Sequence, residues 1–311
     1  MIPFRFLHAA DLHLDSPFKG MAKVPGAVFE RIQNSTFSAL ERLIRTAIRE
    51  KVHFVLFAGD IFDLADRSLR AQFRFHRALE TLAENGIGAF VVHGNHDPVD
   101  GTAVRLDPPE GVHVFGCEDG EAVPVLDASG RLLAYVCGIS YAANAVTENL
   151  ALRFRVPDKN TYSIGLLHTN VDGDPSHDNY APSSLEELAR SPIRYWALGH
   201  IHKRQILRED PLIVYPGNIQ GRSVKETGPK GCYVVDVSNA GTARLTFHAT
   251  DDVRWQVEEL SIEQISSIQQ LKEAWERSLE AVRQHSDGRA VVVRYILKGR
   301  GSIHHSLMKG T

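Results

Sequence analysis

The hydrophobic pattern of the first hundred residues alternates between short apolar runs and longer segments with helical periodicity. Apolar residues fill runs 4–10, 52–58 and 87–92, each of a length typical of a buried strand. Between these runs, segments 28–51 and 68–85 place apolar side chains three and four positions apart, which predicts amphipathic helices. The order strand–helix–strand–helix–strand predicts a parallel sheet with helices on its faces.

After residue 97 the pattern changes, because short β-like runs replace the long helices. These runs are 112–115, 121–126, 132–137, 162–167 and 195–198. Ser183-Ser184-Leu185-Glu186 fits a capping box that starts a short helix. Residues 205–249 hold four apolar runs separated by Pro-, Gly- and Asn-containing turns, which predicts a β-meander. Together these segments favour an α/β (α+β) protein in which two mixed sheets pack face to face with helices outside.

The last sixty residues form a separate pattern that begins after Asp251-Asp252. It predicts a strand, a helix and a second strand, at residues 255–260, about 263–284 and 290–297. Such a segment buries too little apolar surface to be stable alone. We therefore expect residues 251–311 to be the opening β-α-β piece of a second domain, incomplete in this chain.

Composition and charge narrow the class of protein. The 311 residues are 43% hydrophobic and 23% charged, as in a well-cored globular protein. The net charge of -3 does not indicate a nucleic-acid binder, so affinity for a polyanion has to come from a local basic patch and bound metal. The three scattered cysteines favour a reducing cytoplasm. No apolar stretch approaches the roughly 20 residues that span a bilayer, so we expect no membrane association.

Five short polar motifs each follow an apolar run, and they carry the candidate chemistry. They are Asp11-Leu12-His13, Gly59-Asp60-Ile61-Phe62-Asp63, Gly94-Asn95-His96-Asp97, His168, and Gly199-His200-Ile201-His202. In open α/β sheets ligands bind at the carboxyl ends of the strands, which is where these motifs fall. Asp, Asn and His together suit two divalent ions; carboxylate favours manganese, and imidazole also suits iron or zinc.

Taken singly, most of these motifs have a structural explanation. Asp11 could cap a turn, Gly94-Asn95 is a good turn sequence, and a lone His168 is most often a hydrogen-bonded structural residue. The last motif is stronger, because two histidines two positions apart in an extended segment project to the same side. Five strand ends in a row with metal-binding side chains favour a metal site over coincidence.

The motif order resembles the calcineurin-like metallophosphoesterase superfamily over residues 4–249. Two longer stretches, 11–18 and 215–222, resemble the SbcD-like DNA repair exonucleases and, within them, the YhaO-like branch. The resemblance implies a four-layer αββα metallophosphoesterase sandwich. It also implies a catalytic domain over residues 1–250 and a capping domain that starts at residue 251.

The resemblance further implies a role for each motif residue. Metal one would be held by Asp11, His13 and His202, metal two by Asn95, His168 and His200, and Asp60 would bridge them. His96 would face the substrate phosphate as a catalytic residue, with Asp97 as its hydrogen-bond partner. Asp15 and Asp63 lie close by in sequence and could support the ligands. A two-metal centre clamps a phosphodiester and activates a bridging water for attack, while an imidazole such as His96 stabilises or protonates the leaving oxygen.

The substrate is less well determined than the site. The resemblance implies a DNA exo- or endonuclease of DNA repair, working with an SMC-like ATPase and often as a homodimer. A phosphoesterase acting on a small nucleotide or phosphoprotein remains an alternative, as does a non-catalytic protein that binds DNA ends. Five cations near the last motif could line a phosphate path or form a solvated loop face: Arg204, Arg208, Arg222, Lys225 and Lys230. Tyr180 and His177 could add a wall to the cleft.

Overall fold

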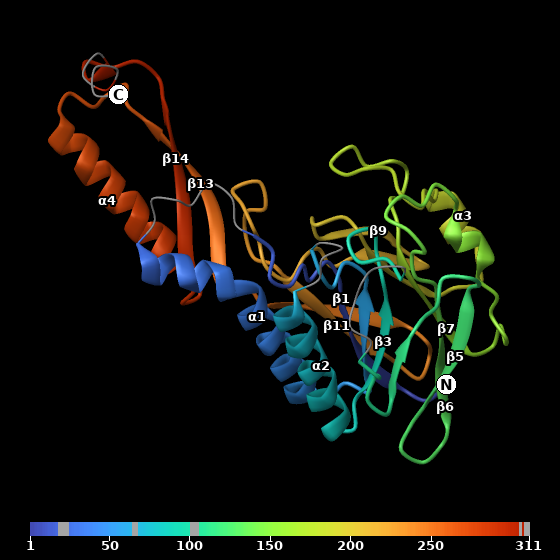
Figure 1. Cartoon of the computed structure of the whole chain (residues 1–311). Helices are drawn as coiled ribbons and strands as arrows, with labels where there is room; N and C mark the ends of the chain where they lie inside the picture. The colour runs from blue at the N-terminus through green and yellow to red at the C-terminus, as the bar shows by residue number, and fades with distance from the viewer. Residues whose placement is uncertain (18–24, 64–67, 100–105, 305–306, 308–311) are drawn as a thin grey trace.

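Two six-stranded mixed sheets form the centre of the molecule (Figure 1). The computed structural model describes residues 1–17, 25–63, 68–99, 106–304 and 307. The first sheet has the strand order β12-β11-β1-β2-β3-β4. Its strands are β1 (Phe4–Ala9), β2 (Phe54–Ala58), β3 (Gly88–Val92), β4 (Val112–Val114), β11 (Gly231–Val237) and β12 (Ala243–Ala249). Strands β1 to β4 are parallel, as the strand–helix alternation predicted, and β11 joins β1 antiparallel.

The second sheet has the order β5-β6-β7-β8-β10-β9. Its strands are β5 (Glu121–Leu126), β6 (Leu132–Gly138), β7 (Tyr162–His168), β8 (Tyr195–Gly199), β9 (Gln205–Glu209) and β10 (Leu212–Tyr215). The predicted meander over residues 205–249 is therefore wrong as a single unit. Strands β9 and β10 complete this sheet, and the chain then crosses to the first sheet, where β11 and β12 pair.

Helices cover the outer face of each sheet, which completes the four-layer arrangement. Helices α1 (Gly26–Arg49) and α2 (Leu69–Glu84) share a buried apolar cluster with the first sheet, including Leu43 and Phe57. The short α3 (Leu185–Arg190) and the 3-10 turn η1 (Leu150–Arg153) cover the second sheet around Trp196. The predicted α/β sandwich with two mixed sheets flanked by helices is confirmed.

Aromatic side chains fill the space between the two sheets. The rings of Phe6 and Phe54 stack with centroids 5.3 Å apart, and Tyr195 of the second sheet meets Phe6 edge-on at 5.1 Å. All three residues are fully buried. This packing fixes one sheet against the other, so the loops at their shared edge have a rigid base.

Two helices begin later in the chain than the sequence predicted. The capping box of α3 is formed by Ser184 and Glu187, one residue later than predicted. Helix α4 (Ile268–Gln284) begins after Ser267, not near residue 263, because the Ser267 side chain accepts a hydrogen bond from the Gln270 backbone N–H.

The C-terminal segment consists of β13 (Val253–Ser261), α4 and β14 (Ala290–Lys298), and it projects away from the sandwich (Figure 1). Its base is anchored by Trp255, whose indole N–H donates to the Gly221 carbonyl at 2.7 Å. The apolar face of α4 stays largely open, since Trp275 is 52% exposed beside only two paired strands. Within the described residues no helix is long and apolar enough to cross a membrane.

Candidate metal centre

The polar motifs meet at one edge of the sandwich, because parallel strands end there. Asp11 and His13 follow β1, Asp60 follows β2, and His168 is the last residue of β7. The backbone of this edge is unusual: Asp11, His13, Asp60 and His200 have φ values of 51°, 43°, 50° and 104°. Left-handed conformations at residues other than glycine cost free energy and cluster at functional sites.

Two glycines allow the motif loops to approach the polar side chains closely. A Cβ atom on Gly94 would lie 2.3 Å from Asp60 Oδ1 and 2.8 Å from His168 Nε2. A Cβ atom on Gly199 would lie 1.8 Å from the Ala58 carbonyl oxygen. Any side chain at these positions would displace the groups that converge here.

The first group of converging side chains is Asp11, His13 and His202. One potential ligand atom from each lies within 4.8 Å of the others. The Nε2 atoms of His13 and His202 are only 3.1 Å apart. Their Nδ1 atoms contact carboxylates, Asp63 at 2.9 Å and Glu226 at 2.7 Å. Each Nδ1–H therefore donates to a carboxylate, which leaves both Nε2 lone pairs aimed at one point.

The second group is Asn95, His168 and His200. The Asn95 Oδ1 atom lies 3.1 Å from both His168 Nε2 and His200 Nδ1, which are 3.3 Å from each other. The remaining ring nitrogens donate to backbone carbonyls: His168 Nδ1 to Ala58 at 2.9 Å and His200 Nε2 to Asp178 at 2.8 Å. When both rings are neutral, the atoms that face one another here are also acceptors.

Asp60 lies between the two groups. Its Oδ2 atom is 3.7 Å from His13 Nε2 and 3.4 Å from His168 Nε2. The residue is 1% exposed, so its charge is almost wholly removed from water. A single carboxylate that reaches both clusters is the arrangement expected of a group shared by two ions.

The chemistry of these donors fits divalent cations. When each ring keeps only its outward N–H, five acceptor atoms on histidine and asparagine face inward in two clusters, around buried carboxylates. Lone pairs at about 3 Å repel unless a cation lies among them, and buried carboxylates need a compensating positive charge. Oxygen and imidazole nitrogen are the ligands of manganese, iron and zinc, so these side chains do not single out one metal.

The pKa values of the histidines also indicate that the buried carboxylates favour a positive charge beside them. Burial disfavours protonation of His168, but Asp60 and Asp11 outweigh it and raise the pKa of His168 to about 9. Burial, reinforced by the charge of Arg222, lowers the pKa of His13 to about 3. Burial, reinforced by the charge of His168, lowers the pKa of His200 to about 3. His13 and His200 are therefore neutral near pH 7, the state that a metal ligand requires.

His96 lies beside these clusters with its ring held in one orientation. Its Nδ1–H donates to the Asp63 carbonyl at 2.8 Å, and the ring meets that of His13 edge-on at 5.0 Å. The expected hydrogen bond between Asp97 and His96 is not formed. The fully buried Asp97 carboxylate instead accepts from the backbone N–H groups of Ile61 and Gly94, at 2.8 and 2.7 Å. Asp97 therefore connects the loops that contain Ile61 and Gly94. The ring of His96 is oriented by the Asp63 carbonyl instead.

A hollow of about 340 Å³ opens at this centre, with Asp60, His96 and His202 among its lining residues. Residues 175–178 form part of its wall, and the His177 ring lies 4.7 Å from that of His202. Tyr180 stands farther back, 6.2 Å from the His200 ring. The predicted wall from this loop is thus present, and a phosphate group could reach the clusters from outside.

The five basic residues near the last motif divide into two kinds. Arg222 pairs with Asp63 at 2.7 Å, and the Lys230 ammonium donates to the His202 carbonyl at 2.9 Å, so both lie at the site. Arg204 stacks on Phe247, and Arg208 donates to a nearby backbone carbonyl. Lys225 is exposed on the surface. Only two of the five can contribute charge at the candidate centre.

The supporting residues were only partly predicted. Asp63 contacts His13 as suggested, whereas Asp15 accepts instead from the Ser68 hydroxyl at 2.6 Å. Glu226, which orients His202, was missed. A usable signal existed, because Glu226 is the single acidic residue between Asp210 and Asp236. Phe18, the last residue of the stretch that carried the finer resemblance, lies outside the described residues.

Comparison with known proteins agrees with this arrangement. The profile of the calcineurin-like phosphoesterases matches residues 4–204, about two thirds of the chain. The chain belongs to the calcineurin-like phosphoesterase family. Within the family it is YhaO-like: it is 42% identical over 298 residues to the uncharacterized metallophosphoesterase YhaO of Bacillus subtilis, covering 94% of this chain and 71% of that protein. The profile of the YhaO middle domain matches residues 255–311.

More distant relatives of this phosphoesterase carry names that refer to DNA repair or to a nuclease. The DNA double-strand break repair protein Mre11 of Sulfurisphaera tokodaii is 30% identical over 66% of this chain and 51% of its own length. The SbcD component of the SbcCD nuclease of Rhodobacter capsulatus is 29% identical over 48% of this chain and 38% of its own length. The chain thus spans about half or less of these two proteins.

Proposed function

We propose that this phosphoesterase is a two-metal phosphodiesterase that acts on DNA, as an exo- or endonuclease. The observation that carries the proposal is the pair of inward-facing acceptor clusters that share Asp60 at the base of an open hollow. Asp11, His13 and His202 would hold one ion, and Asn95, His168 and His200 the other. When bound, two such ions polarise a phosphate group and supply a nucleophilic water near neutral pH, with manganese favoured and iron or zinc as alternatives.

His96 is the residue proposed to act on the leaving group. The Asp63 carbonyl holds its Nδ1–H, so Nε2 is the ring atom free to face a substrate. The side chain is 41% exposed at the mouth of the hollow, where a bound phosphodiester would lie. A proton on Nε2 can pass to the departing oxygen, and the fixed ring orientation keeps that atom in place.

DNA as the substrate is supported by the named functions of the Mre11 and SbcCD relatives and by Arg222 and Lys230 beside the ligands. A small nucleotide or a phosphoprotein is the second candidate, favoured by the hollow of about 340 Å³, which is near the lower end for small-molecule sites. A purely DNA-end-binding role would be favoured by a missing ligand residue. Every expected ligand position is occupied by a competent side chain.

The decisive test is hydrolysis of defined DNA substrates and of a small phosphodiester, each with manganese, magnesium and zinc. We expect cleavage of DNA with at least one metal, and cleavage of the small diester alone would favour the second candidate. The variant His96→Ala should keep its metal and lose turnover by about 10²–10⁴-fold. Near-normal turnover in this variant would remove His96 from the reaction, and hydrolysis of neither substrate would refute the phosphodiesterase.

The proposal extends to domains and partners. Residues 1–250 would form the catalytic domain and residues 251–311 part of a capping domain for DNA, which the match to the YhaO middle domain and the open face of α4 support. By analogy with SbcCD, an SMC-like ATPase and a second copy of the chain would be the protein partners. Comparing duplex cleavage by this chain and by a C-terminally extended chain tests the cap, since equal rates would contradict it.

A further inference from the structure

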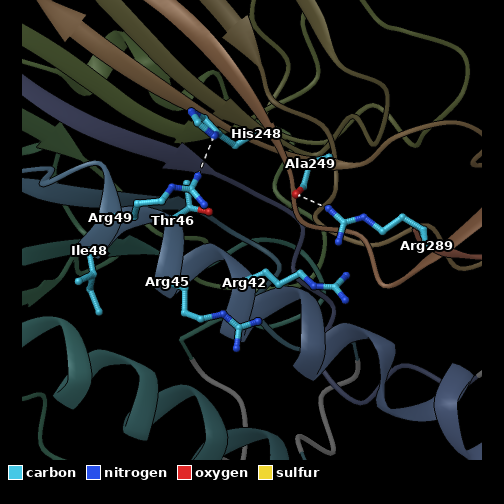
Figure 2. Close-up of a pocket in the computed structure, with 8 residues that line it drawn as sticks. All are labelled: Arg42, Arg45, Thr46, Ile48, Arg49, His248, Ala249 and Arg289. Carbon is cyan, nitrogen blue, oxygen red and sulfur yellow. Dashed lines mark hydrogen bonds between the residues drawn. The ribbon is translucent and has the colours of Figure 1, made fainter. Parts of the chain in front are cut away.

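An arginine-lined hollow lies apart from the metal centre, where helix α1, strand β12 and the start of β14 meet (Figure 2). Its volume is about 560 Å³, and it shares no lining residue with the hollow over the metal ligands. Four arginines line it: Arg42, Arg45, Arg49 and Arg289. His248 adds an imidazole, and no lining residue is acidic.

Two of the four charges are compensated by neighbouring carboxylates. Arg42 pairs with Asp252 at 2.7 Å, and Arg49 pairs with Glu50 at 3.1 Å. Arg49 also lies in the last turn of α1, where a cation interacts favourably with the helix dipole. The positive charges of Arg42 and Arg49 therefore have partners within the protein and need no ligand.

The positive charges of Arg45 and Arg289 are not compensated in this way. Within the described part of the chain, Arg45 has no ion-pair partner, and the Arg289 guanidinium donates only to the Ala249 carbonyl, at 3.0 Å. The Arg289 Nε–H is buried without a hydrogen-bond partner, which costs free energy unless a ligand accepts from it. Burial and then the like charge of Arg42 lower the pKa of the Arg289 guanidinium, and the charges of Asp251 and Asp252 offset this only in part.

We propose that this hollow binds a phosphate group, at a site separate from the metal centre. Guanidinium groups form bidentate hydrogen bonds to phosphate oxygens, and here they surround one space from α1 and from the turn before β14. The volume is large enough for a nucleotide or for one phosphate of a longer backbone. Because Arg289 belongs to the C-terminal segment and Arg45 to α1, the bound phosphate ties that segment to the sandwich. The proposal does not depend on the proposed function.

The test is anion binding by the full, metal-loaded chain and by an Arg45→Ala/Arg289→Ala variant. Arg277→Ala on α4 removes the same kind of charge from an exposed helix and is the matched control. Equilibrium dialysis with inorganic phosphate counts sites for a small anion, and anisotropy of a short phosphorothioate duplex measures binding of a nucleic-acid backbone. Circular dichroism and thermal unfolding verify that each variant is folded.

We expect the double variant to bind phosphate or the duplex at least about tenfold more weakly, with the control unchanged. Weakening with phosphate identifies a small phosphate ligand, and weakening with the duplex alone identifies the nucleic-acid backbone. Equal binding by wild type and variant, or an equal loss in Arg277→Ala, would overturn the proposal. If the double variant does not fold, Arg45→Glu alone is decisive, because Arg45 is exposed and reversal of its charge must weaken binding.

Discussion

Glu226 offers the sharpest test of how the candidate metal centre is held together. Its carboxylate accepts from His202 Nδ1 at 2.7 Å, from Asn218 Nδ2 at 3.1 Å and from the Arg222 backbone N–H at 2.7 Å. Burial disfavours the charged carboxylate, but the His202 hydrogen bond and the Arg222 charge outweigh it and hold the pKa of Glu226 well below its usual range. Glu226 is therefore ionised and fixes the tautomer of His202.

The variant Glu226→Gln keeps the shape and removes the charge. Its amide has one oxygen and one NH₂ group, so it cannot accept all three hydrogen bonds, and the NH₂ must face either His202 or the Asn218 and Arg222 donors. Losing a carboxylate that orients a ligand histidine typically weakens metal binding by about 10–100-fold, which is about 1.4–2.8 kcal/mol. We expect a loss of this size for one of two metal sites.

Calorimetric titration of the metal-free variant with manganese measures this loss directly. Glu121→Gln is a matched control, because Glu121 contacts His113 at 2.9 Å on the surface away from the site. Wild-type affinity at both sites in Glu226→Gln would refute the role of Glu226. An equal loss in Glu121→Gln would show that the effect follows from net charge and not from the orientation of His202.

Three further predictions concern the centre and the joint with the C-terminal segment. Asp60→Ala should lower the metal content from two ions toward one or none by elemental analysis, and a full complement would remove Asp60 from the shared position. Gly94→Ala should lower turnover by at least about 10²-fold, since its Cβ would meet Asp60 Oδ1, whereas Gly26→Ala has open space and should change little. Burial disfavours the charged form of Asp252, but Arg31 and Arg42 outweigh this effect and lower the pKa of its carboxyl group. The ionised carboxylate therefore stabilises the fold at pH values above its unfolded pKa of about 3.9. This stabilisation is lost as the pH falls through the lower pKa of the folded state. Asp252→Asn should therefore cost about 1–2 kcal/mol in denaturant unfolding at pH 7, with the difference closing in acid; a constant difference would contradict this.

Local periodicity predicted most elements because it reports directly on burial. The α1 helix was expected over 28–51 and spans Gly26–Arg49, and strand β5 was predicted to the residue. The meander failed for a non-local reason. Turn residues show that consecutive strands reverse, but they do not show which sheet the next strand joins, and that choice depends on partners far away in sequence.

The candidate site was also predicted only in part. Residues that follow strands could be placed because parallel strands bring their ends to one edge. The hydrogen-bond partners of those residues could not be predicted, because they depend on the conformation of each loop. Asp97 is adjacent to His96 in sequence but accepts from Gly94 and Ile61, while Glu226 reaches His202 from 24 positions away. Sequence neighbours were thus a poor guide to the supporting hydrogen bonds.

The tautomers of the histidines connect these supporting bonds to the chemistry of the centre. His13 and His202 each give one ring hydrogen to a carboxylate, and His168 and His200 each give one to a backbone carbonyl. In every case the acceptor lies outside the cluster, so the neutral ring turns its lone pair inward. A protein that needed these histidines only for stability would satisfy the inward atoms with donors, because a converging set of acceptors is unfavourable alone. The arrangement is instead complementary to positive charge at two adjacent points, and it explains why four residues accept left-handed backbone conformations to reach it.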